Sequence, residues 1–104
     1  MKKEVHPETI QRAIYAYGKV RENLLRHEPG FPEAISLLQL VKHGLPEYGM
    51  GGIGTGKDSQ GSDWIIKILD ENDPRPLWIC VWGGPNTLAQ ALYKIRQTRS
   101  EADI

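Results

Sequence analysis

The sequence is poor in several features that would each point to a class of protein. It has a single cysteine, Cys80, which excludes an internal disulfide and the cysteine-based zinc patterns. It has no run of about 18 apolar residues, so no transmembrane helix and no membrane partner are expected. It also has no excess of charge, because 13 basic residues balance 13 acidic ones. A nucleic-acid partner is therefore not expected either.

Glycines gather in YGMGGIGTGKDS, residues 48–59, and match two nucleotide-binding patterns. The spacing of Gly51 with Gly56 and Lys57 is that of a P-loop, and other glycines have the spacing of a dinucleotide-binding fold. A P-loop needs Ser or Thr after its lysine to bind magnesium, whereas this chain has Asp58, whose carboxylate would repel phosphates. Both motifs also follow a buried strand, but a predicted helix precedes this loop. Nucleotide binding is therefore not predicted, and the loop is either a mobile lid, a place of close backbone approach, or an irregular connection.

Four helices are predicted from the spacing of the apolar residues and from the residues at the helix ends. They run from His6 to about Arg26, from Pro32 to about Lys42, from Ser59 or Ser62 to a point before Asp73, and onward from about Asn86.

One strand is predicted at Leu77–Trp82, where six apolar residues lie between Pro76 and Gly83. A continuous run of this kind is typical of a strand buried on both faces in a parallel sheet. Such a strand needs neighbours on both sides, because each unpaired buried backbone group costs of the order of 1–3 kcal/mol. No other comparable run exists in the 104 residues. The chain therefore either takes strands from a partner, such as a second copy, or is a piece of a larger α/β domain, and we favour the piece.

Several long segments resemble a known family. GSDWIIKILDENDPRPLWICVWGGPNTLAQAL, together with VHPETIQRAIYAYGKVRENLLRHEPGFP and the glycine-rich loop, is similar to the nucleoside-hydrolase-like domain of a bacterial family often labelled cellulose-binding or of unknown function. The resemblance runs from about Lys3 to Arg99. It implies an α/β fold, part of an open, mainly parallel sheet flanked by helices and Rossmann-like. Residues 1–104 would then be a single partial domain, a fragment of the N-terminal domain.

The resemblance also implies an activity for the longer parent protein, namely calcium-dependent hydrolysis of an N-glycosidic or related glycosyl bond in a small-molecule sugar or nucleoside. In true nucleoside hydrolases a backbone carbonyl in a Gly-Pro-Leu-Thr-Asn-Leu-Ala pattern helps to hold calcium. Residues 84–89 read GPNTLA, so by position that carbonyl belongs to Asn86. The D-x-D-x-x-x-D-D cluster, which supplies most calcium ligands and the base in those enzymes, does not occur in this sequence. The chain alone is therefore expected to be inactive.

The turn VWGGPN follows the predicted strand, at the position where open α/β sheets bind ligands. Trp82, Gly83, Gly84 and Asn86 are therefore predicted to contact substrate, and Asn86 is also the predicted metal ligand. An alternative remains, in which the turn only connects strand to helix, Asn86 caps the helix and Trp82 belongs to the core.

A non-catalytic carbohydrate-binding module, for example for cellulose, is the alternative function. The three tryptophans and four tyrosines provide rings that can stack on sugars. Trp78 and Trp82 are expected to be buried in the strand, which leaves Trp64 and the tyrosines. A purely helical interaction domain is disfavoured, because LWICVW would be prone to aggregation if it were exposed.

Overall fold

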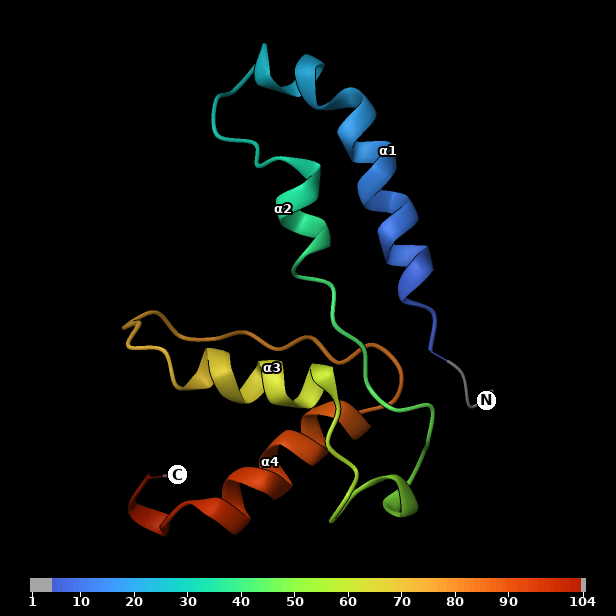
Figure 1. Ribbon diagram of the computed structural model, residues 1–104. Coiled ribbons are helices and arrows are strands. Elements are labelled where there is room, and N and C mark those ends of the chain that lie inside the picture. The colour runs from blue at the N-terminus through green and yellow to red at the C-terminus, as the bar shows by residue number, and fades with distance from the viewer. Residues whose placement is uncertain (1–4, 104) are drawn as a thin grey trace. The chain divides into compact units, whose positions relative to one another are not determined.

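The computed structural model describes residues 5–103 (Figure 1). All regular elements within these residues are helical: α1 (Pro7–Leu25), α2 (Ala34–Leu38), η1 (Met50–Gly52), α3 (Gln60–Leu69), α4 (Asn86–Thr98) and η2 (Glu101–Asp103). The chain divides into two compact units, of which His6–Lys42 is the first and the other described residues are the second. Within residues 5–103, no helix combines the length and the apolar character that crossing a membrane requires.

The first unit consists of α1 and α2, which pack against each other. The hydroxyl of Tyr17 donates a hydrogen bond to the carbonyl of Pro32 at 2.5 Å, and Nε of Arg21 donates to the same carbonyl at 3.0 Å. A Cβ on Gly18 would lie 3.1 Å from the Cβ of Ala34, so glycine lets α2 come close. No residue of either helix is buried. Polar contacts and half-buried apolar side chains therefore hold this unit together.

The second unit is built on the contact between α3 and α4. Ser59 caps α3 in a reciprocal arrangement: its Oγ accepts from the N–H of Ser62 at 3.1 Å, and its own N–H donates to Oγ of Ser62 at 2.9 Å. Such a capping box satisfies two backbone donors at a helix start. Ala91 and Ile95 of α4 are buried. The core of this unit is small, and α4 supplies its buried apolar residues.

Glycines bring the first turn of α3 close to its neighbours. The N–H of Gly61 donates to the carbonyl of His43 at 2.8 Å, and a Cβ on Gly61 would lie 2.9 Å from that oxygen. A Cβ on Gly44 would overlap the side-chain hydroxyl of Thr87. Gly44 and Gly61, which lie on either side of the glycine-rich loop, are therefore positions where a larger side chain does not fit.

The predicted α/β fold with an open, mainly parallel sheet is wrong, because no strand forms among the residues that the structure describes. Residues 77–82 run as an extended trace between α3 and α4 in sequence, and Figure 1 draws them beside α3. Ile65 of α3 shares a small cavity with Ile79 and Val81. Within residues 5–103, however, the backbone of residues 77–82 makes no hydrogen bond to another segment. An apolar run can favour an extended backbone, but a sheet also needs a neighbouring strand.

The predicted burial of the two strand tryptophans is also wrong. Trp78 is 85% exposed and Trp82 is 91% exposed. Cys80, expected in the strand interior, is exposed as well. Without a sheet to cover them, the side chains of this segment remain on the surface.

Candidate functional site

An open groove of about 730 Å³ is formed by two segments that are distant in the sequence, the glycine-rich loop and the turn that leads into α4. We call it the glycine groove. Most of its lining consists of apolar side chains and glycine backbone, and it is formed by Tyr48, Gly49, Met50, Ile53, Gly83, Gly84, Pro85, Asn86 and Ala89. The amide of Asn86 and the hydroxyl of Tyr48 are the hydrogen-bonding side-chain groups in this set. A mostly apolar hollow with a few polar groups is the usual form of a small-molecule site.

The turn beside the groove depends on glycine. Gly83 and Gly49 have φ values of 113° and 72°, in the left-handed region that favours glycine. Gly52 is buried, and a Cβ there would lie 2.7 Å from Nδ2 of Asn86. Glycine at position 52 therefore lets the Asn86 amide approach the loop backbone, where its Nδ2 donates to the carbonyl of Gly49 at 3.0 Å.

A polar stripe on α4 holds the glycine-rich loop. It consists of Asn86, Gln90, Tyr93 and Lys94, whose spacing of i, i+4, i+7 and i+8 places them on one face of the helix. Each member contacts the loop: Asn86 bonds to Gly49, Gln90 to Gly54 and Asp58, Tyr93 to Thr55 at 3.3 Å, and Lys94 to Asp58 at 3.2 Å. The loop therefore has the glycine content of a flexible connection and the contacts of a fixed one.

Gln90 makes the strongest attachment in the stripe. It is only 3% exposed. Its Oε1 accepts from the N–H of Gly54 at 2.8 Å, while its Nε2 donates to the carbonyl of Gly54 at 3.0 Å and to Oδ1 of Asp58 at 2.8 Å. Gly54 presents both backbone groups to this amide with a φ of 133°, which a residue with a side chain rarely adopts.

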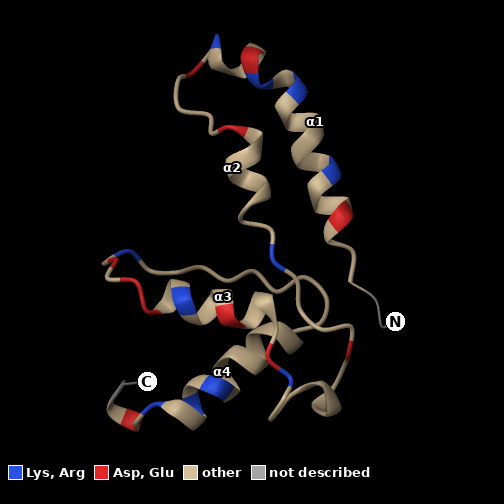
Figure 2. Cartoon of the chain, viewed as in Figure 1, with Lys and Arg blue, Asp and Glu red and all other residues tan. Residues whose placement is uncertain are grey.

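Acidic and basic residues both occur around the loop (Figure 2), and they form ion pairs with one another. The hydrogen bond from Gln90, followed by that from Lys94, lowers the pKa of Asp58 below its ordinary value. The hydrogen bonds to Asp63, at 3.0 Å, and to Asp58 raise the pKa of Lys94. Lys57, the lysine of the P-loop pattern, forms an ion pair with Glu47 at 2.9 Å. This pairing ties Lys57 to the residue that directly precedes the loop.

The predicted substrate contacts fall into two places. Gly83, Gly84 and Asn86 line the glycine groove together. Trp82 does not line it, but lies beside a different, smaller cavity of about 280 Å³. Asn86 is the first residue of α4, and Pro85 holds the capping position in its place. The roles of these residues in binding stay predictions.

Sequence reasoning missed Tyr48 and Gln90, which line or hold the groove. Gln90 carried a signal, because a polar face at helical spacing lies beside the apolar face of the same helix. Its partner, Gly54, is 36 residues away in the sequence, and no local sequence pattern predicts a contact over that separation.

Comparison with known proteins identifies the family. A family model described as "Cellulose-binding Sde182, nucleoside hydrolase-like domain" matches residues 1–104. The chain belongs to this family. This confirms the resemblance seen in the sequence.

A solved structure is also similar to this nucleoside hydrolase-like chain. It is that of a nucleoside hydrolase-related hypothetical protein from Saccharophagus degradans that is associated with carbohydrate metabolism, with 44% identity and a TM-score of 0.90. The match covers 97% of the present chain and 25% of that protein, so the present chain spans about a quarter of its length. No curated protein matches the chain.

The residues described in this nucleoside hydrolase-like chain do not by themselves fit a calcium site. Calcium usually takes about six to eight oxygen ligands, several of them carboxylates. No carboxylate lines the glycine groove. Within residues 5–103, no group of three or more His, Cys, Asp or Glu residues is placed to hold a metal ion. The carbonyl of Asn86 belongs to the first turn of α4 and is directed along the helix. A role for Asn86 in binding calcium stays a prediction.

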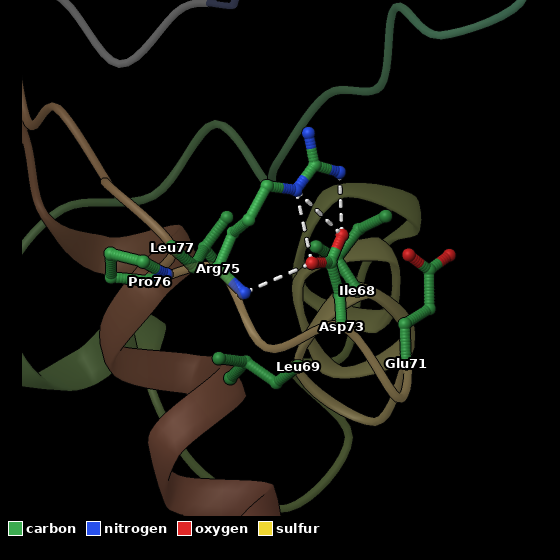
Figure 3. Close-up of a pocket in the computed structure, with 7 residues that line it drawn as sticks. All are labelled: Ile68, Leu69, Glu71, Asp73, Arg75, Pro76 and Leu77. Atoms are coloured by element: carbon green, nitrogen blue, oxygen red, sulfur yellow. Dashed lines mark hydrogen bonds and ion pairs between the residues drawn. The ribbon is translucent and has the colours of Figure 1, made fainter.

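A second hollow of about 470 Å³ lies between the end of α3 and the chain that follows it (Figure 3). Its charged groups are already paired, because Arg75 binds both carboxylate oxygens of Asp73, with Nη2 at 2.5 Å from Oδ2. This pair lowers the pKa of Asp73 and raises the pKa of Arg75. In Figure 3 no hydrogen bond or ion pair joins the carboxylate of Glu71 to this pair. The glycine groove is the better candidate for a ligand site, because one of its polar groups, the amide of Asn86, uses only its Nδ2 in a hydrogen bond to the rest of the described chain.

Proposed function

We propose that the glycine groove binds a sugar unit, and that this chain forms part of a carbohydrate-binding site. The observation that carries the proposal is the meeting of residues 48–53 with residues 83–89 in one open groove. Glycines 49, 83 and 84 allow a ligand to come close to the backbone. Sugar rings have apolar C–H faces as well as hydroxyl groups, and the groove offers the ring of Tyr48 and the side chain of Ile53 to the former.

The amide of Asn86 supplies a directional polar contact for the hydroxyl groups of a sugar. Its Nδ2 is engaged by the carbonyl of Gly49. Its Oδ1 accepts no hydrogen bond from another residue among those described, so it is available to accept one from a sugar hydroxyl. One half of the amide thus holds the loop, while the other half is available for a ligand.

The comparisons support carbohydrate as the class of ligand. The family description contains the term cellulose-binding, and the similar solved protein is associated with carbohydrate metabolism. We therefore take β-linked glucose oligomers as the first ligands to test.

The test is a titration of the isotope-labelled chain with cellotetraose, followed by NMR. We expect chemical-shift changes at Gly49, Gly83, Gly84 and Asn86, and an affinity reduced by about fivefold or more in Asn86→Ala, since a lost hydrogen bond is worth about 1 kcal/mol. Asn23→Ala, an exposed substitution in the first unit, is the matched control and should bind as the wild type does. Equal affinities of Asn86→Ala and the wild type for cellotetraose would show that the glycine groove is not the sugar-binding site.

Hydrolysis of an N-glycosidic or related glycosyl bond is a second candidate, and it concerns the longer protein. It is favoured by the similarity to a nucleoside hydrolase-related protein, of which this chain spans a quarter. No carboxylate lines the groove to act as a general base, so we expect the 104-residue chain to leave nucleosides intact. Release of free base from inosine or uridine by the chain alone would contradict this expectation. Shifts at the groove with uridine and not with cellotetraose would favour a nucleoside as the ligand.

A further inference from the structure

We propose that Gln90 is a positioning residue of the glycine groove, which keeps the loop in the shape that a ligand requires. The expected effect on ligand affinity rests on the proposed function. The expected effect on the loop rests only on the hydrogen bonds of Gln90. Gln90 itself does not line the groove. It acts through Gly54, whose neighbour Ile53 does.

Two residues of α4 attach the loop on either side of its groove-lining part. Asn86 and Gln90 lie one helical turn apart on the same face. Asn86 bonds to Gly49, and Gln90 bonds to Gly54. The residues between these two attachments, 50–53, include Met50 and Ile53 of the groove lining. Loss of the second attachment would leave residues 50–53 held at Gly49 and, on the other side, only through the more distant contacts at Thr55 and Asp58.

The chemistry at position 90 requires a neutral amide. The N–H of Gly54 needs an acceptor and its carbonyl needs a donor, and a glutamine side chain provides both in one plane. The reversed amide would place its NH₂ group against the N–H and its oxygen against a carbonyl and the carboxylate of Asp58. Because Gln90 is 3% exposed, water has little room to replace a lost partner.

The charges that face position 90 make Gln90→Glu a sharp test. Asp58 touches the amide directly, Lys94 binds Asp58, and Asp63 binds Lys94. An ionised carboxylate at position 90 would lack the donor for Gly54 and would repel Asp58. Burial and that like charge would raise the pKa of the new carboxyl group. Once protonated at acid pH, it could again accept from the N–H of Gly54 and donate to the carbonyl of Gly54, but its single O–H replaces only one of the two bonds that Nε2 of Gln90 donates.

The experiment measures amide hydrogen exchange at Gly54 and at Ile66, which lies inside α3, in the ligand-free chain. In Gln90→Glu at neutral pH we expect exchange at Gly54 to be at least about tenfold faster than in the wild type, with Ile66 unchanged. The ratio to the wild type should fall toward one as the pH is lowered, with a midpoint above about 4.3, the ordinary pKa of a glutamate, because the pKa of the new carboxyl group is raised. Gln90→Met, similar in volume but without an amide, should show the faster exchange at every pH. Gln97→Glu, exposed on the same helix, is the control and should show neither effect.

Affinity for cellotetraose should fall by about tenfold or more in Gln90→Glu at neutral pH and recover with the exchange rate at acid pH. If the wild type does not bind cellotetraose, the proposed function fails, while the exchange at Gly54 still decides the role of Gln90. Wild-type exchange at Gly54 in both Gln90 variants would overturn the inference. Loss of protection at Ile66 together with Gly54 would overturn it too, because Gln90 would then support the whole unit and not the loop.

Discussion

The glycine-rich loop, residues 48–59, and the apolar segment, residues 77–82, belong to the same unit and differ in opposite ways from what their compositions suggest. The loop has few large side chains, yet four side chains of α4 bind it, and Gly52 within it is buried. The apolar segment contains Trp78 and Trp82, yet both are more than four-fifths exposed. From composition alone, the glycine-rich loop would be expected to be flexible and the apolar segment to be buried, which is the opposite of what the structure shows.

The difference lies in where each region finds its partners. The loop needs hydrogen-bond partners for its backbone, and α4 of the same chain supplies them through Asn86 and Gln90. The apolar segment needs cover for its side chains and partners for its backbone, and the residues that the structure describes do not supply them. Glycine helps the loop because it lets polar side chains approach the backbone closely. Large apolar side chains help the apolar segment little, because its neighbours leave Ile79 and Val81 about half exposed and the two tryptophans almost fully exposed.

The largest expected effect comes from filling the space that glycine leaves in the loop. A Cβ on Gly52 would lie 2.7 Å from Nδ2 of Asn86 and 3.0 Å from Cβ of Glu47. Gly52→Ala should therefore lower the free energy of unfolding by about 1–3 kcal/mol, the usual cost of overpacking. The neighbouring Gly51 has no atom within 4 Å of the same position, so Gly51→Ala is the matched control and should change it by less than about 0.5 kcal/mol. Urea denaturation of both variants measures the difference, and equal midpoints would show that the loop is not tightly held.

A smaller effect is expected from acid. Gln90 and Lys94 lower the pKa of Asp58, so the ionised form of Asp58 is favoured in the folded chain. Its contribution to stability is present above the ordinary Asp pKa of about 3.9 and is lost as the pH falls through the lower folded value. Exchange at Gly54 should therefore accelerate in the wild type below about pH 4, relative to the intrinsic rate, and do so less in Asp58→Asn.

The control for this acid effect lies outside the loop. Asp73 also has a lowered pKa, through Arg75. Asp73→Asn should alter the acid dependence of the chain near residue 73 and leave exchange at Gly54 as it is in the wild type. A change at Gly54 in this variant would mean that the loop and the turn after α3 respond to acid together.

The sequence predicted the helices well because helix signals are local. The ends of α1, α3 and α4 lie close to the predicted ones, and Ser59 caps α3 as one of the two expected serines. The predicted second helix was too long, since α2 ends at Leu38. For the candidate site, three of the four predicted residues share one groove, because they lie within the four-residue turn 83–86, all of which lines it.

The parts that could not be predicted depend on partners far away in the chain. Gln90 and Gly54 are 36 residues apart, and Asn86 and Gly49 are 37 residues apart. The predicted sheet failed for the same physical reason, because the apolar run at residues 77–82 indicates a local conformation but does not provide a neighbouring strand. The polar stripe on α4 is visible in the sequence as polar residues at helical spacing, but a solvent-exposed helix face has the same pattern, so the stripe does not identify the loop as its partner.

The smallest expected effect is also the most direct test of the exposed segment. Trp82→Ala removes the largest type of side chain, but at 91% exposure that side chain contributes little burial to lose. We expect the free energy of unfolding to change by less than about 0.5 kcal/mol, whereas a tryptophan in a core would cost about 3–5 kcal/mol. Trp64→Ala is the control, because Trp64 is half-buried in α3 with Nζ of Lys67 4.7 Å from its ring, and should cost more than Trp82→Ala. A loss of several kcal/mol in Trp82→Ala would mean that the apolar segment is covered in solution, and the contrast with the glycine-rich loop would then disappear.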